Sequence, residues 1–192
     1  MGNGFDEPVP GSVADQAADA DPEAVARAIA LRQLTVAPRT RAQLAEAMRR
    51  RGVPDDVVER VLDRFEEVQL VDDVEFAQQW VKTRHTGRGL ARRALSHELR
   101  QRGVDDETSR EAVEAIGDDD ELAAARELVR RRWSGTAGND PARQARRLAG
   151  MLARKGYSAG VAYRAIREVA DEVGSADTDG ESLPETWAGD LD

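Results

Sequence analysis

The chain has 192 residues with 28 basic and 37 acidic side chains, for a formal net charge of -9. It contains no cysteine and two histidines, which excludes disulfides, thiolate nucleophiles, iron–sulfur clusters and zinc sites built on Cys or several His ligands. Neither a secretory signal nor an apolar run long enough to cross a bilayer is present, so we expect a cytoplasmic protein without membrane contact.

Both ends of the chain are acidic. Residues 1–22 and 171–192 contain acidic side chains and no basic one, and they are rich in Gly, Ser, Asp and Ala. Such segments bury too little apolar surface to offset the entropy lost on ordering, so we predict disordered acidic tails over 1–22 and 174–192. Between the tails the charge is uneven: residues 82–167 carry 19 basic and 12 acidic side chains, against 9 and 11 in residues 23–81.

Apolar residues between the tails recur at helical spacing, and no segment sustains the alternation of a strand. The pattern therefore predicts an all-α protein. Its helices are expected over residues 23–35, 41–51, 54–67, 73–85, 88–102, 105–116, 119–133, 141–155 and 159–172.

Capping residues mark several of these helix starts. Thr40, Asp72 and Asp118 each stand three residues before Gln or Glu, as in a capping box, in which two side chains satisfy free backbone N–H groups. Prolines suited to a first helical turn occur at Pro22, Pro54 and Pro141.

One helix-then-glycine pattern occurs three times. The segments that begin at Arg41, Arg92 and Ala145 align without gaps, which superposes Leu44, Leu95 and Leu148, then Met48, Leu99 and Leu152, and then Gly52, Gly103 and Gly156. The leucines are 51 and 53 residues apart, a length that suits three helices. Each glycine suits the left-handed conformation that ends a helix. We predict three tandem three-helix repeats, over residues 23–70, 71–117 and 118–173, stacked in an elongated, curved array of the kind used for binding.

No constellation in the sequence supports catalysis, a cofactor or a metal ion. Gly87-Arg88-Gly89 is too short for a dinucleotide fingerprint and follows a helix rather than a strand. The acids at 72–73 and 118–121 stand at helix starts, where capping explains them better than a bound cation does. His97 lacks the carboxylate and hydroxyl partners of a general base. We expect a protein that is not an enzyme and needs no cofactor.

Arginines form stripes along two equivalent helices, 88–102 and 141–155, away from the apolar face of each helix. A guanidinium fork suits phosphates and carboxylates, whereas an ordinary solvated face is the alternative for any single arginine. The candidate residues for binding a partner or DNA are Arg84, Arg88, Arg92, Arg93, Arg100, Arg130, Arg131, Arg143, Arg146, Arg147, Arg154 and Lys155.

Aromatic residues make up only 4% of the chain. Phe76, Trp80 and Trp133 fall at core positions of helices, and Tyr157 and Tyr163 fall at repeat junctions. We expect all five to pack rather than to stack on bases, and hence no sequence-specific base readout.

Several motifs resemble the RecX family. Residues 70–84 (LVDDVEFAQQWVKTR) followed by 87–104 (GRGLARRALSHELRQRGV) are similar to the central signature of that family. Residues 31–44 (LRQLTVAPRTRAQL) and 152–158 (LARKGYS) resemble its first and last repeats, in the right order and spacing.

The resemblance implies a modulator, usually an inhibitor, of the RecA recombinase in DNA repair, recombination and the SOS response. Such a protein lies along the groove of the RecA–DNA filament and suppresses filament growth, ATP hydrolysis and strand exchange. We expect a monomer that meets single- and double-stranded DNA weakly or through the filament.

Two alternatives stay open. One is a helical protein that binds DNA nonspecifically, and the other is a protein–protein adaptor without a nucleic-acid role. The acidic tails disfavour the first, because they compete with phosphates for the arginines. Deleting residues 174–192 then raises DNA affinity at low salt, or changes nothing if the tail is an inert spacer.

Overall fold

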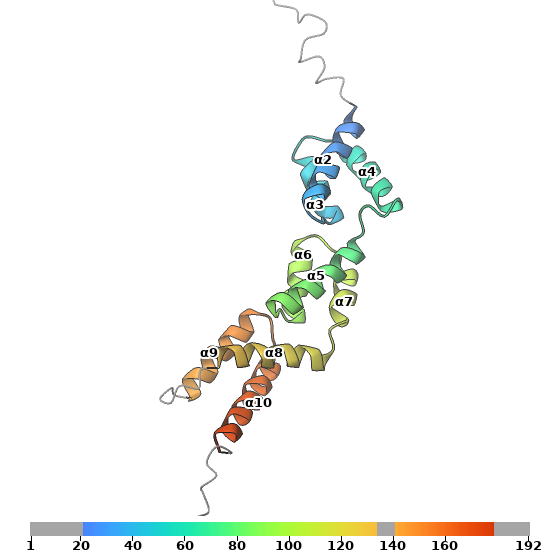
Figure 1. Ribbon diagram of the computed structural model, residues 1–192. Coiled ribbons are helices and arrows are strands. Elements are labelled where there is room, and N and C mark those ends of the chain that lie inside the picture. The colour runs from blue at the N-terminus through green and yellow to red at the C-terminus, as the bar shows by residue number, and fades with distance from the viewer. Residues whose placement is uncertain (1–20, 134–140, 179–192) are drawn as a thin grey trace, which may run out of the picture. The chain divides into compact units, whose positions relative to one another are not determined.

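The computed structural model describes residues 21–133 and 141–178, which form helices and turns with no strand among them (Figure 1). The helices are α2 (Pro22–Val36), α3 (Arg41–Arg49), α4 (Asp55–Glu67), α5 (Asp73–Arg88), α6 (Arg92–Gln101), α7 (Asp106–Glu114), α8 (Asp118–Arg132), α9 (Pro141–Arg154) and α10 (Ala159–Thr178). The all-α prediction is confirmed for this part of the chain. No helix in it combines the length and the apolar character needed to span a bilayer.

Most of the two predicted acidic tails lies outside the described residues. At the C-terminal end, however, α10 runs on to Thr178, past the predicted end at residue 172. The half-buried Val173 packs against the apolar cluster of the preceding helices, so burial carries the helix further than the periodicity indicated.

The described chain divides into two compact units. Unit 1 comprises the chain up to Gln79 together with Leu99–Ser109, and unit 2 comprises Trp80–Glu98 together with the chain from Arg110 onward. Helices α5, α6 and α7 contribute residues to both units. The elongated, curved shape expected of a repeat array stays a prediction.

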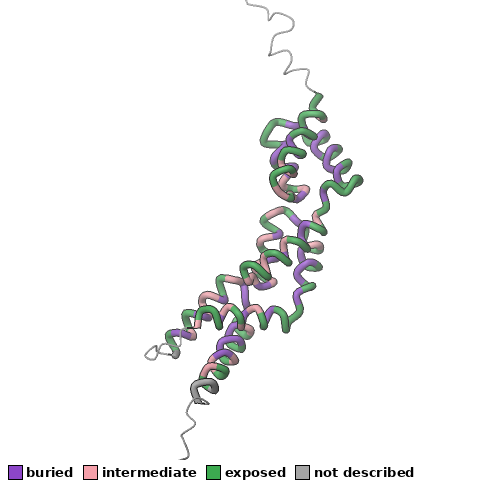
Figure 2. The backbone as a smooth tube through the Cα atoms, viewed as in Figure 1, coloured by how far each residue is buried: buried purple, intermediate pink, exposed green. Residues whose placement is uncertain are grey.

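Unit 1 has its core where α2, α3 and α4 pack on one another. Leu44 and Met48 on α3 meet Val58 and Leu62 on α4, and all four side chains are fully buried. Figure 2 shows the buried positions recurring along α4, as expected for a helix with one apolar face.

Unit 2 has its core where α10 packs against both α8 and α9. Leu148 and Leu152 on α9 occupy the positions of Leu44 and Met48 on α3 and are equally buried. The predicted register of the repeats is confirmed at these positions.

The turn after each aligned helix also repeats. Gly52, Gly103 and Gly156 have φ of 78°, 80° and 91°, the left-handed region that glycine adopts without strain. The next residue's N–H returns to the last turn of the helix in each case: Val53 to Met48, Val104 to Leu99 and Tyr157 to Leu152, at 3.3, 3.2 and 3.1 Å. These bonds satisfy carbonyls that a helix end leaves open, so the predicted helix stops are confirmed.

Hydrogen bonds at aligned positions connect successive repeats. In unit 1 the Thr40 hydroxyl donates to the carbonyl of Arg102 at 2.6 Å, next to Gly103. In unit 2 the N–H of Ala91, which aligns with Thr40, donates to the carbonyl of Lys155 at 2.9 Å, next to Gly156. These bonds connect the start of α3 to the end of α6, and the start of α6 to the end of α9.

Of the three predicted helix caps, those at Thr40 and Asp72 are present and the one at Asp118 is not. Thr40 and Gln43 form the predicted capping box, and Asp72 accepts from the N–H of Glu75 at 2.8 Å. The box predicted at Asp118 is wrong, because Gly117 is the N-cap of α8 and no side chain caps it. Glu121, its expected second member, instead accepts from the backbone N–H of Arg92 at 2.9 Å.

The prolines lie at helix starts. Pro22 and Pro141 are the first residues of α2 and α9. Helix α4 begins at Asp55, one residue later than predicted, so Pro54 is its N-cap and not its first residue.

Candidate partner-binding surface

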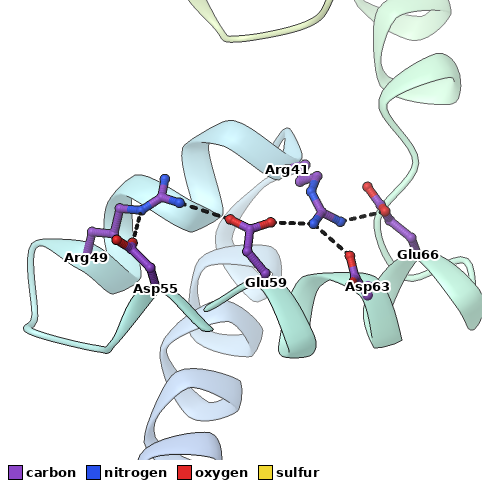
Figure 3. A network of polar contacts seen from close by, with 6 residues as sticks. All are labelled: Arg41, Arg49, Asp55, Glu59, Asp63 and Glu66. Atoms are coloured by element: carbon purple, nitrogen blue, oxygen red, sulfur yellow. Dashed lines mark hydrogen bonds and ion pairs between the residues drawn. The ribbon is translucent and has the colours of Figure 1, made fainter. Parts of the chain in front are cut away.

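In unit 1, Arg41 and Arg49 of α3 are bound by carboxylates that α4 supplies (Figure 3). Both arginines line the groove between α3 and α4. Arg41 lies 2.7 Å from Glu59, 2.7 Å from Asp63 and 2.6 Å from Glu66. Burial alone would lower the pKa of Arg41, but its bonds to these carboxylates raise the pKa overall, so the guanidinium stays charged. Arg49 extends the network to Asp55 and Glu59, at 2.7 and 2.9 Å.

The equivalent groove of unit 2, between α9 and α10, has a different chemistry. The alignment of Gly52 with Gly156 places Ala145 and Ala153 where unit 1 has Arg41 and Arg49. It also places Tyr163 and Arg167 where unit 1 has Glu59 and Asp63. The groove has a volume of about 770 Å³, and small apolar side chains line most of it.

Three arginines line this groove from three helices: Arg93 of α6, Arg146 of α9 and Arg167 of α10. All three are exposed. Arg93 and Arg167 make no ion pair with any residue that the structure describes. Positive charge beside an apolar groove favours a ligand that is both acidic and partly apolar.

Helix α9 carries further positive charge. Arg143, Arg147 and Arg154 are exposed and form no ion pair within the described residues. From Pro141 to Arg154 the helix contains no acidic residue, so nothing on α9 itself offsets these arginines. Among the sequence-predicted candidates, these three residues and Arg93 and Arg146 at the α9–α10 groove are the best placed to meet an anionic partner. Arg167, which also lines the groove, was not predicted.

A second basic groove, of about 620 Å³, lies between the end of α5, α8 and α9. Its cations include Arg88, Arg131 and Lys155. Arg131 is paired with Glu127 at 2.8 Å, and the Lys155 ammonium donates to the carbonyl of Arg88. The Arg131–Glu127 ion pair therefore neutralises part of the charge of this groove, in contrast to the exposed face of α9.

Arg92, another predicted binding residue, is held within unit 2. Its side chain contacts Asp118 and lies 3.0 Å from Glu121. The Glu121 side chain is only 9% exposed, so Arg92 compensates a nearly buried charge. This role is structural, and Arg92 is a poor probe of partner binding.

Three other candidates also have partners within their own unit. Arg130 makes a two-pronged contact with Glu172, with nitrogen–oxygen distances of 2.9 and 3.0 Å. Arg84 lies 4.1 Å from the centre of the Trp80 ring and 4.0 Å from Glu98. The contact of Arg100 is looser, at 3.9 Å from Asp106, and both groups are exposed.

The aromatic predictions hold except at one residue. Phe76 and Tyr157 are buried, and the Tyr157 hydroxyl donates to the carbonyl of Gly89 at 3.1 Å, while burial raises its pKa to about 12. Trp80 and Trp133 are half-buried. The expectation that Tyr163 packs inside is wrong: it is 69% exposed, because its place in the repeat is that of Glu59, on the open side of the groove. The alignment with Glu59 was the signal that could have identified it.

No group of three or more His, Asp or Glu side chains in the described ranges is arranged to hold a metal ion. The chemistry that the arrangement supports is recognition of anionic groups by arginine.

Comparisons with known proteins match the same three-part division. The family models for the first, second and third three-helix domains of RecX match residues 26–65, 72–113 and 118–166. The regulatory protein RecX of Thermobifida fusca (strain YX) is 58% identical over 172 residues, covering 90% of this chain and 91% of that protein. The RecX of Streptomyces coelicolor is 54% identical over 154 residues, covering 80% and 82%.

Solved structures share the fold. The crystal structure of RecX from Lactobacillus salivarius superposes with a TM-score of 0.69 at 19% identity, covering 79% of this chain and 98% of that one. A second crystal structure of a regulatory protein RecX has a TM-score of 0.68 at 24% identity.

Proposed function

This chain belongs to the RecX family of regulatory proteins, and on that premise we propose that it is a negative regulator of a RecA-type recombinase. In this proposal the protein binds along the groove of the recombinase–DNA filament and suppresses filament growth, ATP hydrolysis and strand exchange. It catalyses no reaction itself and acts in the cytoplasm, during DNA repair and recombination and the SOS response.

The observation that carries the proposal is the positive charge of Arg143, Arg147 and Arg154 on α9, which form no ion pair within the described residues. The DNA in a recombinase–DNA filament carries phosphates. Guanidinium groups recognise phosphates and carboxylates by paired hydrogen bonds. Arg143, Arg147 and Arg154 project from one helix without an acidic neighbour on it, so they can pair with such groups without first breaking an ion pair to any residue that the structure describes. Arg41 and Arg49 of unit 1, by contrast, are already bound by carboxylates (Figure 3).

The first experiment is DNA-dependent ATP hydrolysis by the cognate recombinase on single-stranded DNA, with this protein added at substoichiometric and equimolar ratios. We expect a dose-dependent fall that begins at the low ratio, because a filament regulator acts on many subunits at once. No change, with full coverage of the DNA by recombinase, would remove inhibition as the function.

A triple charge reversal on α9 tests the surface. We expect Arg143→Glu, Arg147→Glu and Arg154→Glu together to weaken inhibition more than about 10-fold, because three contacts to phosphates or carboxylates are lost. Each lost phosphate contact should also lower the salt dependence of binding. Thermal stability should barely change, because these side chains are exposed and lack ion pairs within the described residues.

The matched control reverses three exposed arginines of unit 1, Arg32, Arg51 and Arg64, for the same change in net charge. Inhibition by this control should stay within about 3-fold of the unmodified protein, because long-range charge effects are screened. Equal loss in both variants would mean that net charge alone matters. Full inhibition by the α9 variant would place the contact elsewhere.

Nonspecific DNA binding is the second candidate function, favoured by exposed arginines such as Arg88 and Arg143 that make no ion pair with described residues. It predicts tight binding to bare DNA, with a logarithmic affinity that falls linearly with the logarithm of salt concentration. The adaptor alternative predicts affinity for neither DNA nor filament. Cosedimentation with bare DNA and with the recombinase filament separates the three functions.

A further inference from the structure

The α9–α10 groove of unit 2 lacks the side chains that fill the equivalent groove of unit 1. We propose that the chain's own C-terminal segment, residues 179–192, docks into it. This intramolecular contact is independent of the recombinase proposal.

The groove leaves apolar surface exposed to water. Among the apolar lining residues, Ala153 is exposed, Ala145 and Ala149 are half-buried, and Tyr163 stands at the edge with 69% of its surface exposed. The buried side chains of Ala162 and Ile166 complete the lining. Removing such surface from water is favourable in proportion to the apolar area covered. An occupant with large apolar side chains therefore gains stability here.

The charge at the groove selects an acidic occupant. Arg93, Arg146 and Arg167 surround the apolar lining, and no acidic side chain lines the groove. A carboxylate placed beside these guanidinium groups gains charge-assisted hydrogen bonds. A basic or purely apolar segment would leave Arg93 and Arg167 without an ion pair among the described residues.

Residues 179–192 (DGESLPETWAGDLD) have this combination of properties. The segment contains five acidic residues and no basic one. Its three large apolar residues, Leu183, Trp187 and Leu191, recur every four residues between the acidic ones. The alternation of acidic and apolar side chains matches a groove that offers arginines around an apolar floor.

The segment is long enough to reach the groove. About 22 Å of α10 separates Tyr163 from Thr178, at about 1.5 Å per residue. Beyond Thr178 the chain to Trp187 spans up to about 30 Å at about 3.3 Å per residue. Trp187 can therefore return to Tyr163, and the tether gives an effective concentration in the millimolar range.

Unit 1 supplies an internal control. In its α3–α4 groove Arg41 and Arg49 already pair with Glu59 and Asp63, whose charge would repel an acidic segment. The docking that we propose should therefore be confined to unit 2.

The absence of cysteine makes a direct test possible in the full chain. A nitroxide on Ser182→Cys broadens NMR signals of nearby amides. We expect the amides of Ala149 and Ala162 to lose more than half of their intensity and those of Glu59 and Asp63 in unit 1 to keep theirs. No broadening at the α9–α10 groove, or equal broadening in unit 1, would overturn the proposal.

Two controls separate docking from other causes. Adding Leu183→Ser and Trp187→Ser to the labelled protein should restore the groove signals, because the apolar anchors are gone. Broadening that survives these changes would overturn the proposal. A mixture of labelled protein with an isotope-enriched, unlabelled copy should show no broadening, and broadening there would assign the occupant to a second copy instead.

Charge is tested in the same way. Arg93→Glu with Arg167→Glu should reduce the broadening at least 2-fold, whereas Arg60→Glu with Arg64→Glu on α4 should leave it unchanged. Equal effects of the two pairs would overturn the role of the groove arginines. None of these readouts involves DNA or recombinase, so they can fail while the proposed function stands, and the reverse also holds.

Discussion

Helices α3 and α9 occupy equivalent places in the first and third repeats, but they use their arginines differently. On α3, Arg41 and Arg49 are bound by carboxylates of α4. On α9, Arg143, Arg147 and Arg154 have no such partner within the described residues, and the groove beside them is apolar. The buried leucines and the terminal glycine are shared, so a few apolar positions maintain the repeat while its surface is free to specialise.

The largest expected effect tests what the two helices share. Gly156→Ala places a Cβ atom 2.7 Å from both the Cβ and the N of Ala94, in a left-handed turn. We expect a loss of about 2–4 kcal/mol in the free energy of unfolding, from overpacking added to backbone strain. At Gly52 nothing lies within 4 Å of the added atom, so Gly52→Ala should cost only about 1 kcal/mol.

Urea denaturation followed by circular dichroism measures both glycine variants. Equal losses in the free energy of unfolding for Gly156→Ala and Gly52→Ala would mean that the chain around Ala94 moves to accommodate the extra atom. Gly103→Ala, whose added atom would overlap the Cβ of Ala42, should behave like Gly156→Ala.

A smaller effect is expected where the two helices differ. Arg41→Ala leaves Glu59, Asp63 and Glu66 facing one another without their shared cation. Because Arg41 is partly exposed, we expect a loss of about 1 kcal/mol, which shrinks in 1 M salt as screening weakens the repulsion. Arg143→Ala should change stability by less than about 0.5 kcal/mol. A similar loss for both arginines, measured by thermal denaturation, would contradict the contrast between α3 and α9.

The smallest effect concerns Asp73, which accepts from the N–H of Arg41 at 2.9 Å. Burial is the main cause that raises the pKa of Asp73, and the Arg41 N–H opposes it. Since the folded-state pKa is raised, the contribution of Asp73 to stability is full below the ordinary carboxyl pKa of about 3.9 and is lost as pH rises through the folded value.

Asp73→Asn keeps the accepting oxygen and removes the charge. At pH 7 the variant should therefore be more stable than the unmodified protein by less than about 1 kcal/mol, and this advantage should vanish in acid. Denaturation at several pH values from 3 to 7 measures the difference. An advantage that is the same at every pH would assign the effect to packing.

Local patterns in the sequence were sufficient to predict the fold. Leu44, Met48 and Gly52 recur at the same spacing in each repeat, and burial and turn geometry follow from spacing within one helix. Helix ends depend on tertiary packing as well, as at α10, where packing of Val173 extends the helix beyond its periodic stretch.

The candidate site was harder to predict, because tertiary contacts decide which arginines have partners. Glu121 stands where a capping box would place it, yet it serves the start of α6, 29 residues earlier in the chain. Both uses satisfy a helix N-terminus, and the sequence does not specify which helix receives the carboxylate. The sequence therefore predicts Arg92 as a binding residue and Tyr163 as a packed one, whereas Arg92 pairs with Glu121 and Tyr163 lies on the open side of α10.

The bond from the N–H of Ala91 to the carbonyl of Lys155 has a consequence for biosynthesis. A ribosome makes the chain from the N-terminus, so the start of α6 is synthesised well before its partner at the end of α9. Tyr157, which donates to the carbonyl of Gly89, emerges even later. A nascent chain arrested before Lys155 therefore lacks both contacts, and unit 2 reaches its native packing only after the last repeat has left the exit tunnel.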